Sequence, residues 1–382
     1  MSMKRLAAGI AVTWLPMTAL AVETSFDGFL TIGAGSVSES GIDYAGYDDD
    51  WSFEPDTVSG FQLGANFTDR LSATAQVVIR GSDDFEPELE WAYLSFDVTD
   101  SVTVRGGRLR PPFFVVSDFY DVGFAYPWVR PVEEVYMNIP FTHYEGMDII
   151  FNTSIGDWDA TIQAYAGGED GDQEYRGSNV DRKLEDFMGI AFTFDRNALS
   201  LRASYHQADV TFDVEDTRPL FDALRGLGFG AVADDVAIIA KPADFVEVAA
   251  TYDADGWFLR GEATQTDFSR GMVADQQSWY VTGGAYVADF TPYLTYSRVE
   301  TDPESGYADA IPFGLDPGLD VLRLTVEGII AGSKTDRAAI SVGTRWNVLD
   351  NTAIKAEVTF ADDKLPTGTD FNVYSLVVNV LF

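Results

Sequence analysis

The sequence predicts an all-β fold, a single transmembrane antiparallel β-barrel of sixteen strands. Three observations support this prediction. Segments in which apolar and polar residues alternate recur at about the 9 to 11 residues that a tilted strand needs to cross a bilayer. Tight turns and longer acidic links follow these segments in alternation. No apolar run approaches the roughly 18 uninterrupted residues of a membrane-spanning helix.

The first 21 residues have the features of a secretory signal peptide. Lys4 and Arg5 form a basic start, residues 6–15 are an apolar run too short to span a bilayer, and Ala19-Leu20-Ala21 is a small-residue cleavage site. A buried N-terminal helix is the alternative. We expect an exported protein whose mature chain, residues 22–382, forms one barrel domain.

The chain is strongly acidic, with a formal net charge of −36, and it contains no cysteine. A nucleic-acid partner would require a basic face, so the charge argues against one. The lack of cysteine excludes a disulfide scaffold and a thiolate metal site. No motif for a cofactor is present. The acidic segments Asp48-Asp49-Asp50 and Glu169-Asp170-Gly171-Asp172 are candidate Ca²⁺ or Mg²⁺ ligands on loops, but they lack EF-hand spacing, and solvated acidic loops are the alternative.

Alternation locates the strands along the chain. In one clear case Phe61, Leu63, Ala65 and Phe67 alternate with small or polar residues, so that one face of the segment is apolar. The predicted strands begin near residues 25, 57, 71, 88, 101, 144, 158, 185, 198, 244, 256, 277, 290, 336, 352 and 372.

The links between the strands differ in length in a regular way. Every second link is a tight turn with the residue types that turns prefer, such as Thr68-Asp69-Arg70, Gly156-Asp157 and Leu349-Asp350-Asn351. The remaining links are longer and acidic. Short periplasmic turns and long extracellular loops are typical of bacterial outer-membrane barrels.

Two long links carry helix signals. Thr217-Arg218-Pro219 and Asp316-Pro317 each provide a helix start, and leucine or valine residues then recur at helical spacing. We expect short helices in both extracellular loops. The alternative makes residues 236–240 and 321–327 strands, which would raise the strand count to eighteen.

The last strand places five apolar side chains on one face and ends the protein. These residues are Tyr374, Leu376, Val378, Val380 and the terminal Phe382. This ending resembles the C-terminal sorting signal of bacterial outer-membrane proteins, which the barrel-assembly machinery recognises. We therefore expect that machinery to be a partner.

By these features the mature chain resembles the Gram-negative outer-membrane porins, the trimeric sixteen-stranded general diffusion channels. Residues 340–346, followed by Asn351, Ala353, Lys355 and Glu357, are similar to the late-strand pattern of that family, and residues 107–131 to its long third loop in marine and environmental proteobacteria. The resemblance implies an integral outer-membrane protein, a homotrimer surrounded by lipid and lipopolysaccharide. It also implies a third loop, about residues 110–142, folded into the lumen. A loop over the rim or a subunit contact is the alternative.

The predicted constriction combines loop acids with cations on the inner wall. Basic residues of alternating strands should face inward because a cation on the lipid face near the midplane would cost roughly 2 to 4 kcal/mol. Facing acids and arginines would set a transverse field that selects solutes by charge. Alternatively, each arginine pairs with a neighbouring carboxylate and holds the strands together. The candidate residues are Asp118, Asp121, Glu133 and Glu134 on the loop, and Arg105, Arg202, Arg260 and Arg345 on the wall.

The function that follows is passive diffusion of ions and small hydrophilic solutes through a water-filled pore. A substrate-specific channel for a sugar, a dicarboxylate or phosphate is the alternative, and an outer-membrane barrel enzyme or an adhesin is more distant. Only His143 and His206 are present, and no nucleophile, zinc-protease or phosphate-loop motif accompanies them. The sequence therefore predicts no enzyme.

Overall fold

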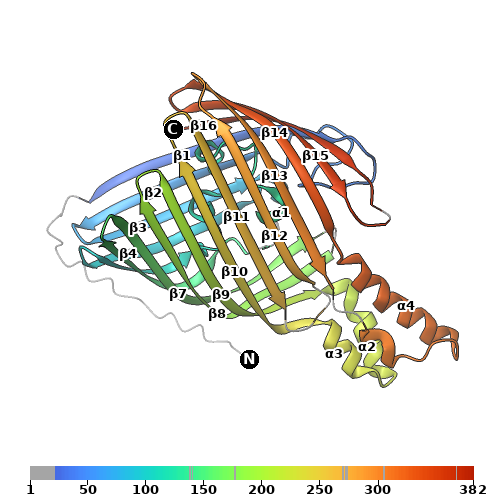
Figure 1. Ribbon diagram of the computed structural model, residues 1–382. Coiled ribbons are helices and arrows are strands. Elements are labelled where there is room, and N and C mark those ends of the chain that lie inside the picture. The colour runs from blue at the N-terminus through green and yellow to red at the C-terminus, as the bar shows by residue number, and fades with distance from the viewer. Residues whose placement is uncertain are drawn as a thin grey trace, which may run out of the picture.

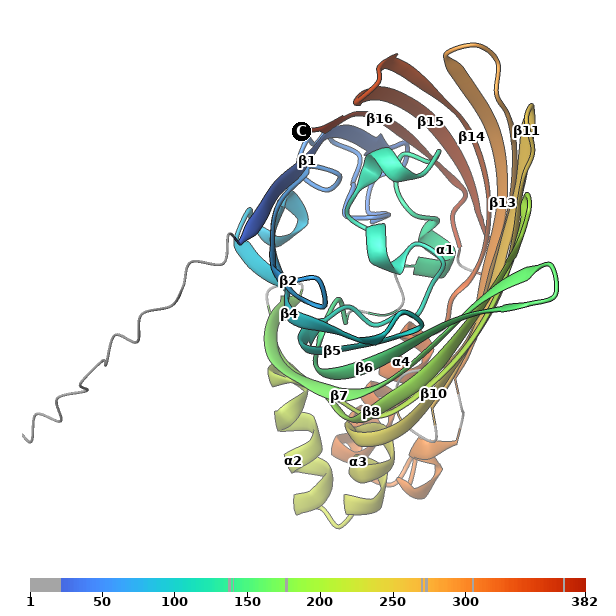
Figure 2. The same ribbon diagram turned by 90° about the vertical axis from the view of Figure 1, so that its left-hand side faces the viewer.

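The computed structural model describes residues 22–136, 139, 141–175, 178–268, 271, 274–303, 306–366 and 368–382. They form a closed barrel in which each strand is antiparallel to its neighbours and the last strand pairs with the first (Figures 1 and 2). The predicted signal peptide, residues 1–21, lies outside the described residues.

Sixteen strands build the barrel, which confirms the prediction from alternation. They are β1 (Glu23–Val37), β2 (Val58–Thr68), β3 (Leu71–Arg80), β4 (Pro87–Thr99), β5 (Val102–Leu109), β6 (Tyr144–Ile155), β7 (Trp158–Tyr175), β8 (Ser178–Arg196), β9 (Leu199–Val214), β10 (Ile238–Asp253), β11 (Trp257–Phe268), β12 (Asp275–Ala285), β13 (Phe290–Asp302), β14 (Asp336–Leu349), β15 (Thr352–Asp363) and β16 (Phe371–Leu381).

Two strands begin earlier than the alternation predicts. β8 starts at Ser178 rather than near residue 185, and β10 starts at Ile238 rather than near residue 244. Charged side chains that pair across strands sustain the longer β7–β8 ladder; Lys183 Nζ lies 2.8 Å from Asp170 Oδ2. Residues 169–172 therefore lie in β7 and not in a loop. A polar strand lacks the apolar face by which alternation is recognised.

The two faces of the barrel wall differ in the way that a membrane requires. Leu294 and Tyr296 point outward from β13 and are 55% and 40% exposed, whereas Thr295 between them points inward and is 1% exposed. The barrel closes where Gly28 N donates to Phe382 O at 2.7 Å and Phe382 N donates to Gly28 O at 3.0 Å. Closure leaves no strand edge unpaired, as hydrocarbon surroundings demand.

The links are short at one end of the barrel, here called the turn end, and mostly longer at the other, here called the loop end. The short links are residues 69–70, 100–101, 156–157, 197–198, 254–256, 286–289 and 350–351. Gly156 and Asn197 adopt positive φ values of 63° and 52°, a conformation that glycine and asparagine tolerate best. The predicted segregation of loop length is confirmed for the other links, but β7 ends at Tyr175 and β8 begins at Ser178, so their link at the loop end is as short as a turn.

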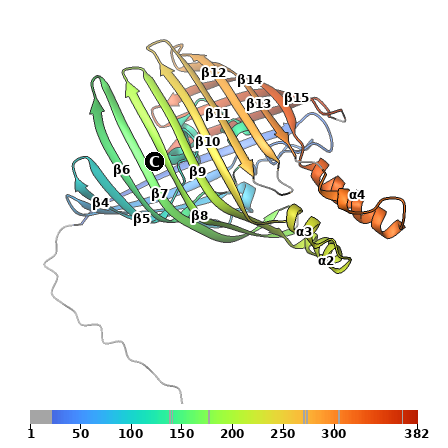
Figure 3. The same cartoon turned by 60° about the horizontal axis from the view of Figure 1, so that its bottom comes forward.

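Helices form in the two long links where they were expected. They are α2 (Arg218–Gly226), α3 (Gly230–Val236) and α4 (Pro317–Gly332), and they lie beyond the loop end of the barrel (Figures 1 and 3). Asp316 caps α4, because its Oδ1 accepts a hydrogen bond from Gly318 N at 2.7 Å.

The eighteen-strand alternative is therefore wrong. Residues 321–327 lie within α4, and Val236 ends α3. Leu322, Val326 and Ile330 recur at helical spacing and are buried in one cluster with side chains of α2 and α3, so tertiary packing stabilises the helical form. No helix in the described part of the chain combines the length and apolarity needed to cross a membrane.

The third long link, residues 110–143, enters the barrel and is here called the third loop. Figure 2 looks along the barrel and shows this segment, with α1 (Glu133–Tyr136), inside the ring of strands. It also carries the short 3-10 helices η2 (Ser117–Phe119) and η3 (Gly123–Ala125). Its aromatic side chains pack against those of the inner wall in one buried cluster. The loop therefore takes the predicted place in the lumen.

Candidate pore constriction

A buried network of charges holds the start of the third loop to the wall. Arg80 at the end of β3 lies 2.8 Å from both Asp121 and Glu90, and Arg110 lies 2.5 Å from the same two carboxylates. Burial alone would raise the pKa of Asp121, but the two guanidinium groups hold it well below its usual range. Asp121 thus acts in a neutralised anchor, here called the arginine anchor, and it does not face the arginines of the opposite wall.

Aromatic packing fixes the next part of the loop against β8, β9 and β10. The ring centroid of Phe113 lies 5.6 Å from that of Phe187, 4.9 Å from that of His206 and 5.4 Å from that of Phe245. These contacts bury both Phe113 and His206. The rings cover the wall at this point, so water and solutes must pass elsewhere in the lumen.

Several wall cations donate hydrogen bonds to the backbone of the loop. Arg345 Nη1 donates to Phe124 O at 2.5 Å, and Lys355 Nζ donates to Trp128 O at 2.7 Å. Arg202 donates to the carbonyl oxygens of Pro112 and Phe113 and also pairs with Glu247. A loop backbone that has no strand partner is satisfied in this way.

The far part of the loop is held by side chains of β12, β13, β14 and β16 and by Asp56 in the link before β2. Trp128 Nε1 donates to Thr282 Oγ1 at 3.0 Å, and Arg130 Nε donates at 2.8 Å to Asp56, which precedes β2. Glu134 accepts hydrogen bonds from Ser297 Oγ at 2.8 Å and from Arg337 Nε at 3.0 Å. The loop is therefore tied to most sides of the barrel.

Glu133 differs from its neighbour Glu134. Among the described residues, its Oε2 is buried without a hydrogen-bond partner. Burial, supported by the nearby charge of Glu134 and opposed by Arg337, raises the pKa of Glu133 to about 8. The group is thus largely protonated at neutral pH and contributes little negative charge to the lumen.

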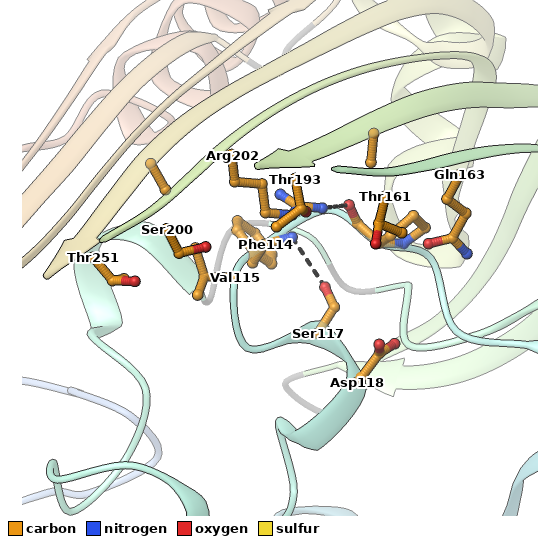
Figure 4. A pocket seen from close by; sticks show the side chains of 13 residues that line it. Phe114, Val115, Ser117, Asp118, Thr161, Gln163, Thr193, Ser200, Arg202 and Thr251 are labelled. Carbon is orange, nitrogen blue, oxygen red and sulfur yellow. Dashed lines mark hydrogen bonds between the residues drawn. The ribbon is translucent and has the colours of Figure 1, made fainter. Parts of the chain in front are cut away.

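Asp118 is the loop acid that remains available to solutes. Its side chain is exposed, and no hydrogen bond or ion pair links it to another described residue. It borders a cavity of about 280 Å³ between the start of the third loop and the inner wall, here called the Asp118 cavity (Figure 4). The wall side is formed by residues of β7 to β10, among them Thr193, Ser200 and Arg202.

One group of side chains could ligate a metal. Glu88, Glu90 and His143 each bring one ligand atom within 4.8 Å of the others. Burial, together with the charge of Arg108, lowers the pKa of His143 to about 4, so its imidazole is neutral. Both oxygens of Glu90 accept hydrogen bonds from arginines, so a cation would compete with the arginine anchor.

Solved structures share this fold at low sequence identity. An anion-selective porin from Comamonas acidovorans matches with a TM-score of 0.59 and 14% identity over 94% of this chain and 100% of that one. The outer membrane channel DcaP of Acinetobacter baumannii matches at 0.58 and 12% over 94% and 97%, and the trimer form of OmpT of Vibrio cholerae at 0.56 and 10% over 95% and 100%. The chain has the fold of an outer-membrane porin. No family model and no curated sequence matches it.

Within this porin fold the predicted constriction residues are spread around the lumen. Arg105 pairs with Asp148 on β6, and Arg260 lies 3.1 Å from Asp253. Arg202 and Asp118 line one cavity, whereas Arg345 contacts the far part of the loop. The four loop acids do not form one cluster: Asp118 is free, Asp121 is in the arginine anchor, and Glu133 and Glu134 lie beside Arg337.

Sequence reasoning missed the groups that hold the loop in the porin lumen. The predicted constriction residues did not include Glu90, Arg80, Arg110, Arg130 or Arg337. Glu90 stands between Leu89 and Trp91 in β4, so its inward direction follows from alternation. The partners of Glu90 could not be predicted in this way, because Arg110 and Asp121 lie in the third loop, where no strand pattern gives the direction of a side chain.

Proposed function

We propose that the protein forms a water-filled channel across the outer membrane, through which ions and small hydrophilic solutes diffuse passively. The proposal rests mainly on the position of the third loop. This loop lies inside a closed barrel yet leaves a polar cavity beside the exposed Asp118. A loop held in this way narrows the lumen as a fixed element, with no conformational change. Aromatic packing and the arginine and lysine side chains that donate hydrogen bonds to its carbonyl oxygens keep the loop in place. Water fills the remaining space of the lumen.

The same fold supports proposals on how the barrel is inserted and what it contacts in the membrane. An exported chain that lacks its leader would be inserted by the barrel-assembly machinery through its last strand, and its apolar outer face would contact lipid and lipopolysaccharide. The trimer form of a structural neighbour supports a homotrimer. Ca²⁺ or Mg²⁺ on exposed acids such as Asp49 is a further proposal.

Conductance in a planar bilayer tests the channel directly. Purified mature protein should produce discrete, ohmic current steps in potassium chloride. A plugged adhesin would insert without any current, and that result would remove the proposal. Deletion of the loop is no useful control because the buried cluster would lose its packing; a charge-preserving variant such as Lys334→Arg, at the end of the α4 link, should leave the steps unchanged.

An enzymatic role would need accessible chemistry. Ser204 Oγ lies 2.8 Å from His206 Nε2, which is the contact of a nucleophile with its base. Both residues are buried, and the ring of Phe113 covers His206. This burial supports a structural role. If Ser204→Ala abolished hydrolysis of an ester substrate by the purified protein, the proposal of a non-enzymatic channel would be overturned.

A further inference from the structure

The wall residues of the Asp118 cavity lie near the turn end of the barrel. Thr161 follows the turn at residues 156–157, Thr193 and Ser200 flank the turn at 197–198, and Thr251 precedes the turn at 254–256. The opposite side of the cavity is the start of the third loop, including Pro112, Phe114 and Val115. A solute that has passed the loop would meet this cavity next.

Free hydroxyl groups line the wall side of the cavity. Among the described residues, the side chains of Thr193, Ser200 and Thr251 have no assigned hydrogen-bond partner. Gln163 donates to Asp148 Oδ2 at 2.7 Å and retains its amide oxygen as an acceptor. Figure 4 shows these side chains on one side and Asp118, on η2, on the other. The cavity thus offers several neutral hydrogen-bonding groups to a solute.

The charge of the cavity is negative. Arg202 is the cation in its lining, but this guanidinium is occupied by Glu247 and by two loop carbonyl oxygens. Asp118 has no such partner. An anionic solute would therefore find no free cation here, whereas a cation would find one free carboxylate. Part of the loop side is apolar, as is common in sites for small molecules.

From this combination we propose that the Asp118 cavity is a binding subsite for small solutes that carry one protonated amine and several hydroxyl groups. Asp118 pairs with the ammonium group, and Thr193, Ser200 and Thr251 bind the hydroxyl groups. The proposal rests on the proposed channel function, because solutes reach the cavity through the lumen.

Three sugars of one ring size test the subsite. Glucosamine, glucose and glucuronate are added in turn to single channels in potassium chloride at pH 6, where the amine is protonated, and the concentration that halves the current is measured. We expect glucosamine to act at the lowest concentration and glucuronate at the highest. Asp118→Asn should raise the half-blocking concentration of glucosamine by about fivefold, the effect of one exposed ion pair, and leave that of glucose unchanged.

Two further variants separate the contributions. Ser200→Ala should weaken the block by glucosamine and by glucose alike, because it removes a hydroxyl contact. Asp222→Asn makes the same chemical change as Asp118→Asn on the exposed face of α2, beyond the loop end of the barrel, and it should have no effect. Equal half-blocking concentrations for the three sugars, or a block by glucosamine that Asp118→Asn leaves intact, would overturn the subsite. The absence of current in salt alone would instead overturn the channel itself, so the two failures are distinguishable.

Discussion

The cations of the inner wall differ in how their charge is compensated, and this difference sets what each can do to a passing ion. Arg105 and Arg202 have the carboxylates of Asp148 and Glu247 as partners. Arg345 donates to Asn347 and to loop carbonyl oxygens, and no carboxylate among the described residues pairs with it. Its positive charge is therefore available to the lumen.

We predict that Arg345→Gln shifts the channel toward cations. A unit charge about 7 Å from an ion in water contributes roughly 0.6 kcal/mol, with opposite sign for cations and anions, so the ratio of cation to anion permeability should rise by up to about sevenfold. The reversal potential in a potassium chloride gradient measures this ratio. Arg196→Gln, which removes an arginine paired with Asp157 at the exposed turn end, is the matched control and should change it little.

Glu133 makes the stability of the folded protein depend on pH. Its folded-state pKa of about 8 exceeds the ordinary value of 4.5, so the folded protein retains a proton that the unfolded chain releases. The contribution of this carboxyl group to stability is therefore lost as the pH rises from about 4.5 to 8.

The Glu133→Gln variant should lack this pH-dependent loss of stability, because glutamine does not titrate. We expect the free energy of unfolding of the variant, measured in urea at several pH values, to fall less than that of the wild type between pH 4.5 and 8. Curves that run parallel through this window would show that the carboxyl group titrates normally in the folded barrel.

At the scale of elements, the third loop is a segment without regular hydrogen bonding that the barrel holds by side chains. The arginine anchor fixes its start, Phe113 and Phe114 fill the space beside β8 to β10, and Trp128 reaches β12 and β13. Backbone carbonyls are satisfied by Arg345 and Lys355. Many modest contacts thus replace the ladder that a strand would provide.

We predict that Asp121→Asn loosens this element strongly. The substitution leaves Arg80 and Arg110 buried with one carboxylate fewer, and breaking a buried ion pair costs about 3 to 5 kcal/mol. The free energy of unfolding should fall by that amount, and single-channel current should become noisier. Asp83→Asn is the control, because Asp83 is half exposed and 3.9 Å from Arg80, and its loss should cost under about 1 kcal/mol.

For the whole molecule, the barrel wall separates two media, and neighbouring residues of one strand experience them differently. Val248 in β10 points outward and is 53% exposed, whereas Ala249 points inward and lines the Asp118 cavity. The outward side chains need an apolar surrounding, and the inward ones need water or the third loop.

Arginine at these two adjacent positions should therefore have opposite consequences. Val248→Arg should lower the stability of the barrel by about 2 to 4 kcal/mol, the cost of a cation on the lipid face near the midplane, and leave conductance unchanged. Ala249→Arg should cost less stability but reduce single-channel conductance for potassium. Equal destabilisation by the two substitutions would contradict the assignment of the two faces.

Patterns within the chain were enough to predict the strand number, the short turns and the helices at Pro219 and Pro317, because each depends on side chains close in sequence. They also placed the third loop in the lumen, through a family resemblance. The early start of β8 could not be predicted, since charged residues there form a strand only by pairing with β7 and β9.

The roles of individual charges were decided by tertiary structure alone. Alternation shows that a side chain faces inward, but it does not show which partner meets it there. Asp118 and Asp121 are three positions apart, yet one is free in a cavity and the other is buried between two arginines. Charge in a lumen depends on distances between groups far apart in sequence, and only the closed barrel with its inserted loop sets those distances.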